Sequence, residues 1–496
     1  MRQKSNVRIL LALLLCSQLQ NGCKVGPNYA KPATPYLDQN WTDAAHPRLN
    51  GEPIDLCNWW ESFGDPTLVA LIHDATCENL QIKEAGKRIL EARALRNVAA
   101  GNLYPQQQSL DTSFTDNRIS GNVANFVVVP GFFETDRTFN NWQTGFGIAW
   151  ELDFWGRFRR TVEAADAQVD QSIAGLNAVR VLVLSEVAKN YIELRSLEAR
   201  IAIANKHVAI QKRLYDLSQA RLEEGAGNKL DVHQSASRLA NVEAVLPGLE
   251  ILRRQASHRL CVLLGRTPAD LESVLGSTGQ IPNPPQNVAA GIPSDLLRRR
   301  PDVHVAEREL ATQSAKIGIS EAEFYPHISL VGQIGLQSED LSRLFQTDSL
   351  IGAVGPGVRW NLLNYGRIKN KWIADKEAFQ RLAYTYHGSV LNAYREVEDS
   401  QVAYLRGFDR VEAIERTVHE SSEAARIGYD TFVEGGVDFG RVLILQTDLV
   451  RAEDELLAAR SDVALSLVKL FLSLGGGWTP SGCHNVQMAS HPMVRH

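Results

Sequence analysis

Two long stretches of this chain repeat one another at a constant offset of 210 residues (360 − 150 for their first tryptophans). Four matched positions fix the offset: Trp150 with Trp360, Gly156-Arg157 with Gly366-Arg367, Glu224-Gly225 with Glu434-Gly435, and Leu264-Gly265 with Leu474-Gly475. Solenoid repeats are only ~20–50 residues long. A repeat of this length, matched without insertions, therefore predicts a duplicated half-domain.

The first 23 residues have the pattern of an export signal. A short apolar run over residues 9–15 follows a basic region that consists of Arg2, Lys4 and Arg8. The run is too short to span a membrane, which takes ~20 apolar residues. Gly22 before Cys23 is the cleavage pattern of bacterial lipoproteins, although Gln20 stands where Leu is usual. We expect residues 1–22 to be a lipoprotein signal peptide and Cys23 to carry a covalent lipid. Ordinary cleavage nearby, with Cys23 a free thiol, is the alternative.

Composition indicates a folded, exported protein. The net charge of −5 offers no basic footprint for nucleic acid. The six cysteines are spread out, and their spacing predicts neither a metal site nor a disulfide framework, although Cys57 and Cys77 could pair. We expect no metal and no cofactor beyond the lipid on Cys23. We also expect no enzymatic activity, because no catalytic order of Ser, His and Asp and no phosphate loop is present.

Four segments alternate apolar and polar residues with the period of a β-strand. They are residues 109–115, 143–154, 328–336 and 349–362, two in each repeat. The apolar faces carry four large aromatic residues: Trp142, Phe146, Trp150 and Trp360. Strands of ~10 residues with one apolar face, one polar face and terminal aromatics are typical of a membrane β-barrel. A soluble sheet with one wet face is the alternative.

Four strands are too few to close a barrel, and an open sheet edge is not tolerated in lipid. If these strands lie in a membrane, several chains must share the barrel, and three chains would supply 12 strands. The four aromatic residues would then contact lipid.

The rest of the chain is predicted to be helical. Residues 156–223 and 366–433 contain no proline and repeat apolar residues at spacings of three and four. A helix of ~67 residues is ~100 Å long, which is typical of a coiled coil or a helical tube. Shorter helices are predicted over residues 66–100 and 231–264, and glycine-rich turns at 224–228 and 434–438 reverse the chain.

These patterns divide the chain into six parts. After the signal peptide come a lipid-anchored segment (23–65), the first repeat (66–279), a proline-rich linker (280–293), the second repeat (294–477) and a polar tail (478–496). The first repeat contains a helix, two strands, a long helix and a further helix, and the second repeat has the same order.

Four motifs give this chain a family resemblance. They are Cys23-Lys24-Val25-Gly26-Pro27-Asn28-Tyr29, the run Trp59 to Leu68, the run Gly291 to Val303 with its Arg-Arg-Arg-Pro-Asp, and Phe154-Trp155-Gly156-Arg157. Together they resemble the TolC-like outer-membrane channel family, in the lipoprotein branch that serves resistance–nodulation–division efflux pumps. The resemblance covers nearly the whole mature chain.

The resemblance implies an α+β membrane protein that works as a homotrimer. A 12-stranded β-barrel in the outer membrane would continue into a long α-helical barrel in the periplasm. A periplasmic adaptor and an inner-membrane transporter would deliver small molecules to this passive exit duct.

The resemblance also draws attention to the turn at 434–438. Relatives commonly have a second Asp in the motif that follows this turn, and it contributes to an acidic constriction, but here the residue is Ile444. Arg441 and Asp231 occupy equivalent positions of the two repeats (441 − 210). We hypothesise that Arg441 pairs with Asp231 or Asp438 around a trimer and holds the helical tips together. The alternative is that Arg441 faces solvent or the adaptor.

Two other functions remain open at this point. The same fold could serve as the outer-membrane duct of a type I protein secretion system. A periplasmic coiled-coil scaffold without a pore is the other possibility, and the four alternating strands count against it. The sequence does not identify the exported substrate, the cognate pump or the adaptor.

Overall fold

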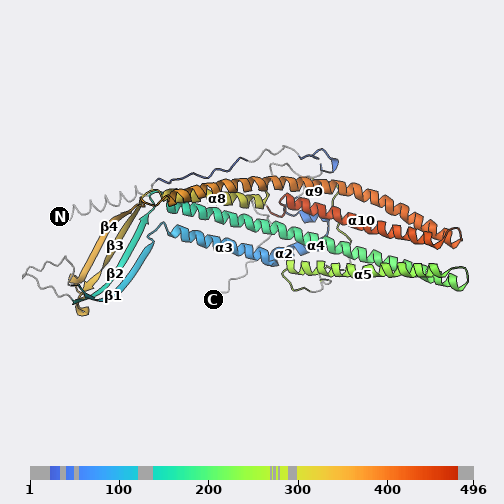
Figure 1. Ribbon diagram of the computed structural model, residues 1–496, viewed down its shortest axis with the longest axis horizontal. Helices are drawn as coiled ribbons and strands as arrows, with labels where there is room; N and C mark the ends of the chain where they lie inside the picture. Colours follow the sequence, from blue (N-terminus) through green and yellow to red (C-terminus); the bar gives the residue numbers. More distant parts are fainter. Residues whose placement is uncertain are drawn as a thin grey trace, which may run out of the picture. The chain divides into compact units, whose positions relative to one another are not determined.

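The computed structural model describes residues 23–33, 41–49, 55–120, 138–268, 271, 275–276, 280–288 and 299–478 (Figure 1). The elements, in chain order, are η1 (Pro47–Leu49), η2 (Trp59–Phe63), α2 (Pro66–Glu78), α3 (Leu80–Gly101), β1 (Gln107–Arg118), β2 (Thr138–Leu152), α4 (Arg157–Glu223), α5 (Lys229–Leu263), α8 (Pro301–Ala322), β3 (His327–Ser338), η3 (Leu341–Arg343), η4 (Thr347–Ser349), β4 (Leu350–Arg359), α9 (Arg367–Val433) and α10 (Phe439–Ser473). None of the helices in these ranges is both long and apolar enough to cross a membrane.

The helix bounds follow the 210-residue offset of the sequence. α4 and α9 have 67 residues each, α5 and α10 have 35 each, and both pairs begin 210 residues apart. The turns between them use Gly225 and Gly435, with φ of +76° and +83°. This left-handed conformation costs glycine little and ends each long helix.

One predicted helix is interrupted. The sequence predicts a single helix over residues 66–100, but the structure has α2 and α3 with a break at Asn79. The Asn79 side chain accepts hydrogen bonds from the backbone N–H groups of Gln81 and Ile82, and it donates one to the carbonyl of Leu263. Asn79 therefore caps α3 at its N-terminus and ties it to the end of α5.

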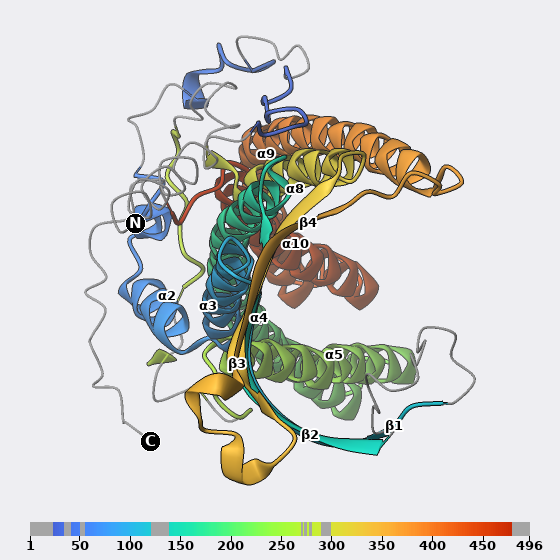
Figure 2. The same ribbon diagram turned by 90° about the vertical axis from the view of Figure 1, so that its left-hand side faces the viewer.

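The four strands form one antiparallel sheet in the order β1-β2-β3-β4, drawn as a curved ribbon in Figure 2. Phe146 lies opposite Leu110 on one side and Ile334 on the other. Directly opposed residues of a sheet share a face, so the apolar residues predicted on each strand lie together. β2 ends at Leu152, earlier than predicted, because the Asp153 carboxylate accepts hydrogen bonds from the backbone N–H groups of Phe158 and Arg159 at the start of α4.

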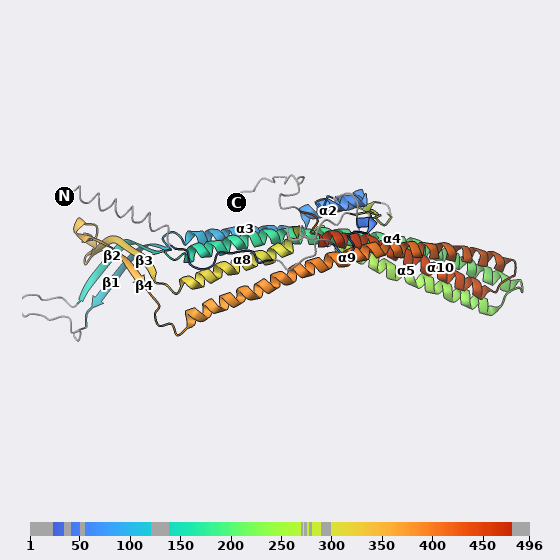
Figure 3. The same ribbon diagram turned by 90° about the horizontal axis from the view of Figure 1, so that it is seen from above.

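The chain forms two compact units, and each combines parts of both repeats. The first unit contains residues Met1–Pro32, Leu90–Gln171 and Glu307–Thr385, and therefore the whole sheet. The second contains Ala33–Ile89, Ser172–Ala306 and Tyr386–His496. In the second unit, α5 runs back along α4 and α10 runs back along α9 (Figures 1 and 3).

The core of the second unit explains two of the sequence motifs. Trp59 is fully buried and stacks on Phe471, with ring centroids 5.1 Å apart. The buried Arg300 donates to the carboxylates of Asp302 (2.6 Å) and Glu396 (2.7 Å), and to the carbonyl of Ser473. Burial disfavours the charged form of Arg300, but its carboxylate partners outweigh that effect and raise the pKa of the guanidinium. The Arg-Pro-Asp motif thus holds a buried guanidinium against a half-exposed carboxylate at the start of α8.

The possible pairing of Cys57 with Cys77 does not occur. Cys57 is disulfide-bonded, whereas Cys77 is an exposed, free thiol on α2.

Candidate functional site

The sheet has one apolar face that nothing in the described chain covers. Leu110 on β1 is 76% exposed, and Val354 on β4 is 78% exposed. No strand residue belongs to either apolar core cluster of the described residues. A soluble sandwich would need a second layer over this face. The exposed apolar band is instead what a lipid-facing sheet requires.

The opposite face is polar and rich in glycine. Ser109 and Asp111 on β1 lie opposite Gly147 and Gly145 on β2, and Gln143 lies opposite Gln337 on β3. Ser109 donates a hydrogen bond of 2.6 Å to Asp111. Such a face can line an aqueous space.

Three of the four aromatic residues predicted to contact lipid, Trp142, Phe146 and Trp150, lie on the apolar face of β2. The fourth, Trp360, directly follows β4. Phe146 is exposed, and Trp142 packs on Phe114, with ring centroids 4.4 Å apart. The indole N–H of Trp150 donates to the carbonyl of Leu103, and that of Trp360 donates to the carbonyl of Phe324. The two repeats therefore hold equivalent tryptophans by equivalent hydrogen bonds. Each indole N–H has an acceptor, and each ring lies near the end of its strand.

The N-terminal motif is held by a close crossing of two glycines in the first unit. Gly26 has φ of +84°, and a Cβ on it would lie 2.5 Å from the Cα of Gly318 on α8. The fully buried Arg160 donates to the carbonyls of Val25 (3.0 Å) and Gly26 (2.6 Å). Only glycine fits at this crossing, which accounts for its place in the motif.

Charge pairs complete this attachment and leave Cys23 exposed. Lys24 lies 2.6 Å from Glu163, and Lys31 lies 3.0 Å from Glu307. Burial opposes ionisation of Glu163, but the hydrogen bonds from Lys24 and Arg160 outweigh it and lower the pKa of the carboxyl. The chain directly after Cys23 is thus fixed to α4 and α8.

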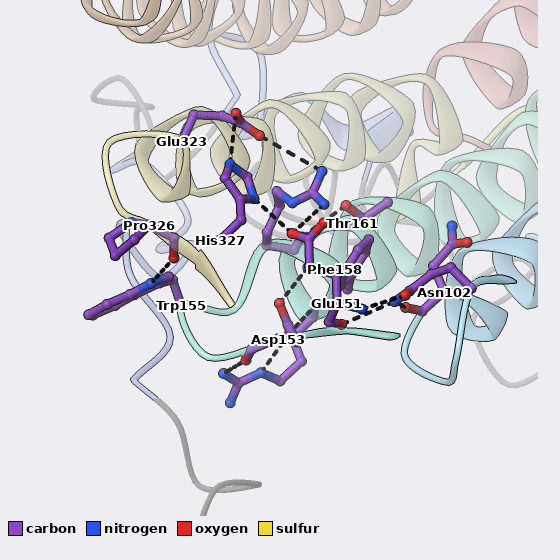
Figure 4. A network of polar contacts seen from close by, with 12 residues as sticks. Asn102, Glu151, Asp153, Trp155, Phe158, Thr161, Glu323, Pro326 and His327 are labelled. Atoms are coloured by element: carbon purple, nitrogen blue, oxygen red, sulfur yellow. Dashed lines mark hydrogen bonds and ion pairs between the residues drawn. The ribbon is translucent and has the colours of Figure 1, made fainter. Parts of the chain in front are cut away.

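A polar network joins the two repeats where strands meet helices (Figure 4). Glu151, at the end of β2, accepts from Arg157 (2.7 Å) and contacts Nδ1 of His327 at 2.8 Å. His327 begins β3, and its Nε2 lies 3.5 Å from Glu323, the residue after α8. Arg157 also reaches Glu323, at 3.8 Å. Two residues of each repeat therefore brace the base of the sheet. Sequence reasoning missed this network because no local pattern joins His327 to Glu151.

The two helical tips have the same capping geometry. Asn228 accepts from the backbone N–H of Asp231, and Asp438 accepts from that of Arg441, both at 3.0 Å. The Asp438 carboxylate is therefore the N-cap of α10. Within the described part of one chain, the Arg441 guanidinium has no ion pair with Asp231 or Asp438, and Arg441 is exposed. Pairing between copies stays a prediction.

An apolar cluster lies behind the second tip. It consists of Leu214, Phe432, Phe439, Val442 and Leu443, all buried. The guanidinium of Arg221 lies over the Phe432 ring, with Cζ 4.3 Å from its centroid, and donates to the Phe432 carbonyl. Arg221 thus connects the end of α4 to the α9–α10 turn. Ile444, the residue after Leu443, is 50% exposed.

Comparison with known proteins agrees with this geometry. The family model described as "Outer membrane efflux protein" matches residues 71–266 and 292–476. Nodulation protein T of Rhizobium leguminosarum bv. trifolii is 27% identical over 465 residues, covering 94% of this chain and 96% of that protein. Outer membrane protein OprJ of Pseudomonas aeruginosa is 27% identical over 477 residues, with coverage of 94% and 96%.

Solved structures share the fold. The outer-membrane channel OprN matches with a TM-score of 0.85 at 29% identity, covering 92% of this chain and 100% of that chain. The Campylobacter jejuni CmeC outer membrane channel matches with a TM-score of 0.84 at 20% identity, covering 93% and 96%.

Proposed function

Because the chain belongs to the outer membrane efflux protein family, we propose that three copies assemble into one passive duct for small molecules. The chain itself is an outer-membrane channel component that extends into the periplasm, and it is not an enzyme. The observation that supports a trimer is that the four-stranded sheet of one chain is open. β1 and β4 are its edges, and its apolar face is bare. A sheet in lipid must close, and three sheets of four strands close as a 12-stranded barrel.

The apolar face would contact lipid and the polar, glycine-rich face would line the pore. The helices would continue the duct into the periplasm, where an adaptor and an inner-membrane resistance–nodulation–division transporter would deliver the cargo. The names of relatives support small molecules rather than the polypeptide cargo of type I secretion. CusC of Escherichia coli is a cation efflux system protein, and TtgF of Pseudomonas putida is a toluene efflux pump outer membrane protein.

One pair of variants tests the lipid-facing assignment. Arginine at position 146 should impair insertion of the barrel by ~2–4 kcal/mol if it lies near the bilayer midplane. Gln143→Arg, on the same strand but the opposite face, is the matched control and should insert like wild type. The amount of heat-resistant trimer in outer-membrane fractions and the retention of a cationic dye in a strain lacking the chromosomal copy are the two readouts. Equal insertion of Phe146→Arg and wild type would reject the assignment.

Cys23 would carry the lipid that anchors the mature N-terminus. An acyl chain adds ~0.8 kcal/mol of membrane affinity per buried methylene. Because the barrel also inserts, Cys23→Ser should slow assembly more than it reduces efflux. Mass spectrometry of the mature N-terminal peptide decides the matter, and an unmodified Cys23 would refute this part of the proposal.

A further inference from the structure

The turn between the second strand and the long helix of each repeat is packed in the first repeat and bare in the second. In the first repeat, Asp153 caps α4, and the Trp155 ring stacks on Tyr325 with centroids 4.4 Å apart. The indole N–H of Trp155 donates to the carbonyl of Pro326 (Figure 4). None of residues 152–159 is exposed. The first turn is therefore closed by contacts within the chain.

The equivalent turn of the second repeat leaves its apolar side chains in the open. Leu363 and Tyr365, which occupy the positions of Asp153 and Trp155, are 87% and 98% exposed. Tyr365 has φ of +51°, and among the described residues it is the only one besides glycines with a positive φ. Side chains with a Cβ rarely adopt this conformation. Trp360, just after β4, continues the apolar face of that strand into the turn.

Acidic residues of the first turn neutralise the basic residues that begin α4. Arg157 lies 2.7 Å from Glu151, and Arg159 lies 3.0 Å from Asp153. All four side chains are partly buried. The positive charge at the start of α4 is therefore matched within the chain.

The second repeat keeps the basic residues and lacks the acids. Arg367 and Lys369 occupy the positions of the two arginines, and both are exposed. Asn361 and Leu363 stand in place of the two acids, and no Asp or Glu occurs from residue 360 to residue 372. The second turn therefore combines bare apolar side chains with positive charge that its own sequence does not match.

This combination fits the headgroup region of a membrane, where apolar side chains enter the acyl boundary and basic side chains pair with lipid phosphates. We propose that the β4–α9 turn, residues 360–369, is a docking surface for anionic phospholipids in the outer-membrane leaflet that faces the periplasm. The turn joins the sheet to a helix, and the helices extend into the periplasm, so this leaflet is within reach. The inference rests on the proposed lipid-facing sheet, whose apolar face it extends.

A neighbouring copy of the chain would not match the charge of this turn. In the proposed barrel, β4 of one copy pairs with β1 of the next, so the turn would lie beside the residues that lead into β1. Residues 92–110, which include the end of α3 and the start of β1, contain no Asp or Glu. Charge complementarity therefore favours phosphate groups over a second protein chain.

Native mass spectrometry of the full-length protein, purified from outer membranes and released from detergent, measures the lipid preference. Dioleoylphosphatidylglycerol is compared with dioleoylphosphatidylcholine, which has the same acyl chains and no net charge. We expect wild type to retain the anionic lipid about fivefold more tightly for each basic residue that contacts it. Arg367→Gln and Lys369→Gln should each lose that factor. Equal retention of the two lipids by wild type would overturn the proposal.

Arg381→Gln is the matched control. Arg381 is exposed on the same helix, 14 residues beyond Arg367 (381 − 367), which is ~21 Å at the rise of an α-helix. Charges are screened beyond ~8 Å at physiological ionic strength, so this variant should keep the preference. Leu363→Asp introduces the acid of the first repeat and should lower the preference as much as Lys369→Gln. If Arg381→Gln loses as much as Arg367→Gln, the turn is not the docking surface.

A nitroxide label on Leu363→Cys distinguishes lipid from a neighbouring copy. The variant is made in a Cys77→Ser background, because Cys77 is an exposed, free thiol, and the unsubstituted background is subtracted. In vesicles of phosphatidylethanolamine and phosphatidylglycerol, we expect a mobile label that collides more with oxygen than with a water-soluble nickel complex. A label immobilised by packed protein, or one that collides more with nickel, would contradict lipid contact.

The mass spectra also separate failure of this inference from failure of the proposed function. Absence of a trimer in wild type would count against the proposed assembly. An intact trimer without a preference for the anionic lipid would count against the docking surface alone.

Discussion

The two helical hairpins, α4–α5 and α9–α10, share one backbone and differ in what they bury. Both turn at a left-handed glycine, and both begin the second helix with a side-chain cap. α10 buries residues along its whole length, including Phe439, Val442 and Leu443 at the tip. The equivalent residues of α5 are Lys229, Val232 and His233, and none of them is buried.

The two hairpins thus share helix lengths and caps but differ in which side chains they bury. The tip of α10 is sealed within its own chain, against Leu214 and Arg221 of α4. α5 instead exposes apolar side chains such as Val245 and Ile251. In the proposed trimer these residues are available to a neighbouring copy. The α9–α10 tip should therefore be stabilised by contacts within one chain, and the α4–α5 hairpin by contacts between chains.

The largest expected effect comes from removing the apolar cluster at the second tip. Phe439→Ala should destabilise the α9–α10 tip by ~3–5 kcal/mol, because it removes a buried aromatic ring. The equivalent change in the first repeat, Lys229→Ala, removes no buried group and should stay within ~0.5 kcal/mol. Amide hydrogen exchange across the two turns measures both effects. Similar losses of protection in the two variants would break the comparison.

The next effect concerns the link between the two hairpins. Arg221→Gln loses both the stacking on Phe432 and the hydrogen bond to its carbonyl, which together should weaken the tip by ~1–2 kcal/mol. Single-channel conductance in a planar bilayer should rise, because the second hairpin is less firmly held. Arg221→Lys keeps the charge but not the planar group and should recover only part of the wild-type behaviour. A complete recovery in Arg221→Lys would show that charge alone matters.

The helix caps should behave alike in the two repeats. Asn228→Ala and Asp438→Ala each remove one side-chain acceptor from a helix N-terminus, at a cost of ~1 kcal/mol. Asp438→Asn keeps the acceptor and should be nearly neutral. Hydrogen exchange of the first turns of α5 and α10 reports each cap separately. A loss of protection in only one of the two helices would mean that the two caps contribute different free energies despite their shared backbone geometry.

The smallest effect per pair is expected for the predicted charge contacts between copies. Exposed ion pairs contribute only ~0–1 kcal/mol each, but three would break together in a trimer. Arg441→Glu should therefore raise single-channel conductance. Asp231→Arg or Asp438→Arg, added to Arg441→Glu, should lower it again. Unchanged conductance in Arg441→Glu would leave the buried Val442 and Leu443 as the seal.

Local patterns predicted most of the fold. Strict alternation placed β2 and its apolar face, with an error at the end where Asp153 turns to cap α4. The absence of proline and the left-handed glycines predicted the bounds of α4 and α9 within a residue or two. Contacts between distant segments could not be predicted in this way. In the sequence, Arg160 resembles any solvated helical arginine, and its burial depends on Gly26 and Gly318 meeting in the fold.

The helix break at Asn79 shows a different difficulty. A polar residue within a helical pattern is usually solvated, whereas Asn79 caps α3 and also donates to the carbonyl of Leu263, which is distant in sequence. The pairing predicted for Arg441 involves other copies of the chain, so it stays a prediction.

The central claim is that one chain supplies one third of a closed barrel. Native mass spectrometry of the protein, purified from outer membranes and released from detergent, tests it most directly. We expect a single species with three times the mass of one mature chain, which dissociates only when the detergent also denatures the sheet. A stable monomer with an intact sheet would contradict the account, because its open edges and bare apolar face could not remain in lipid.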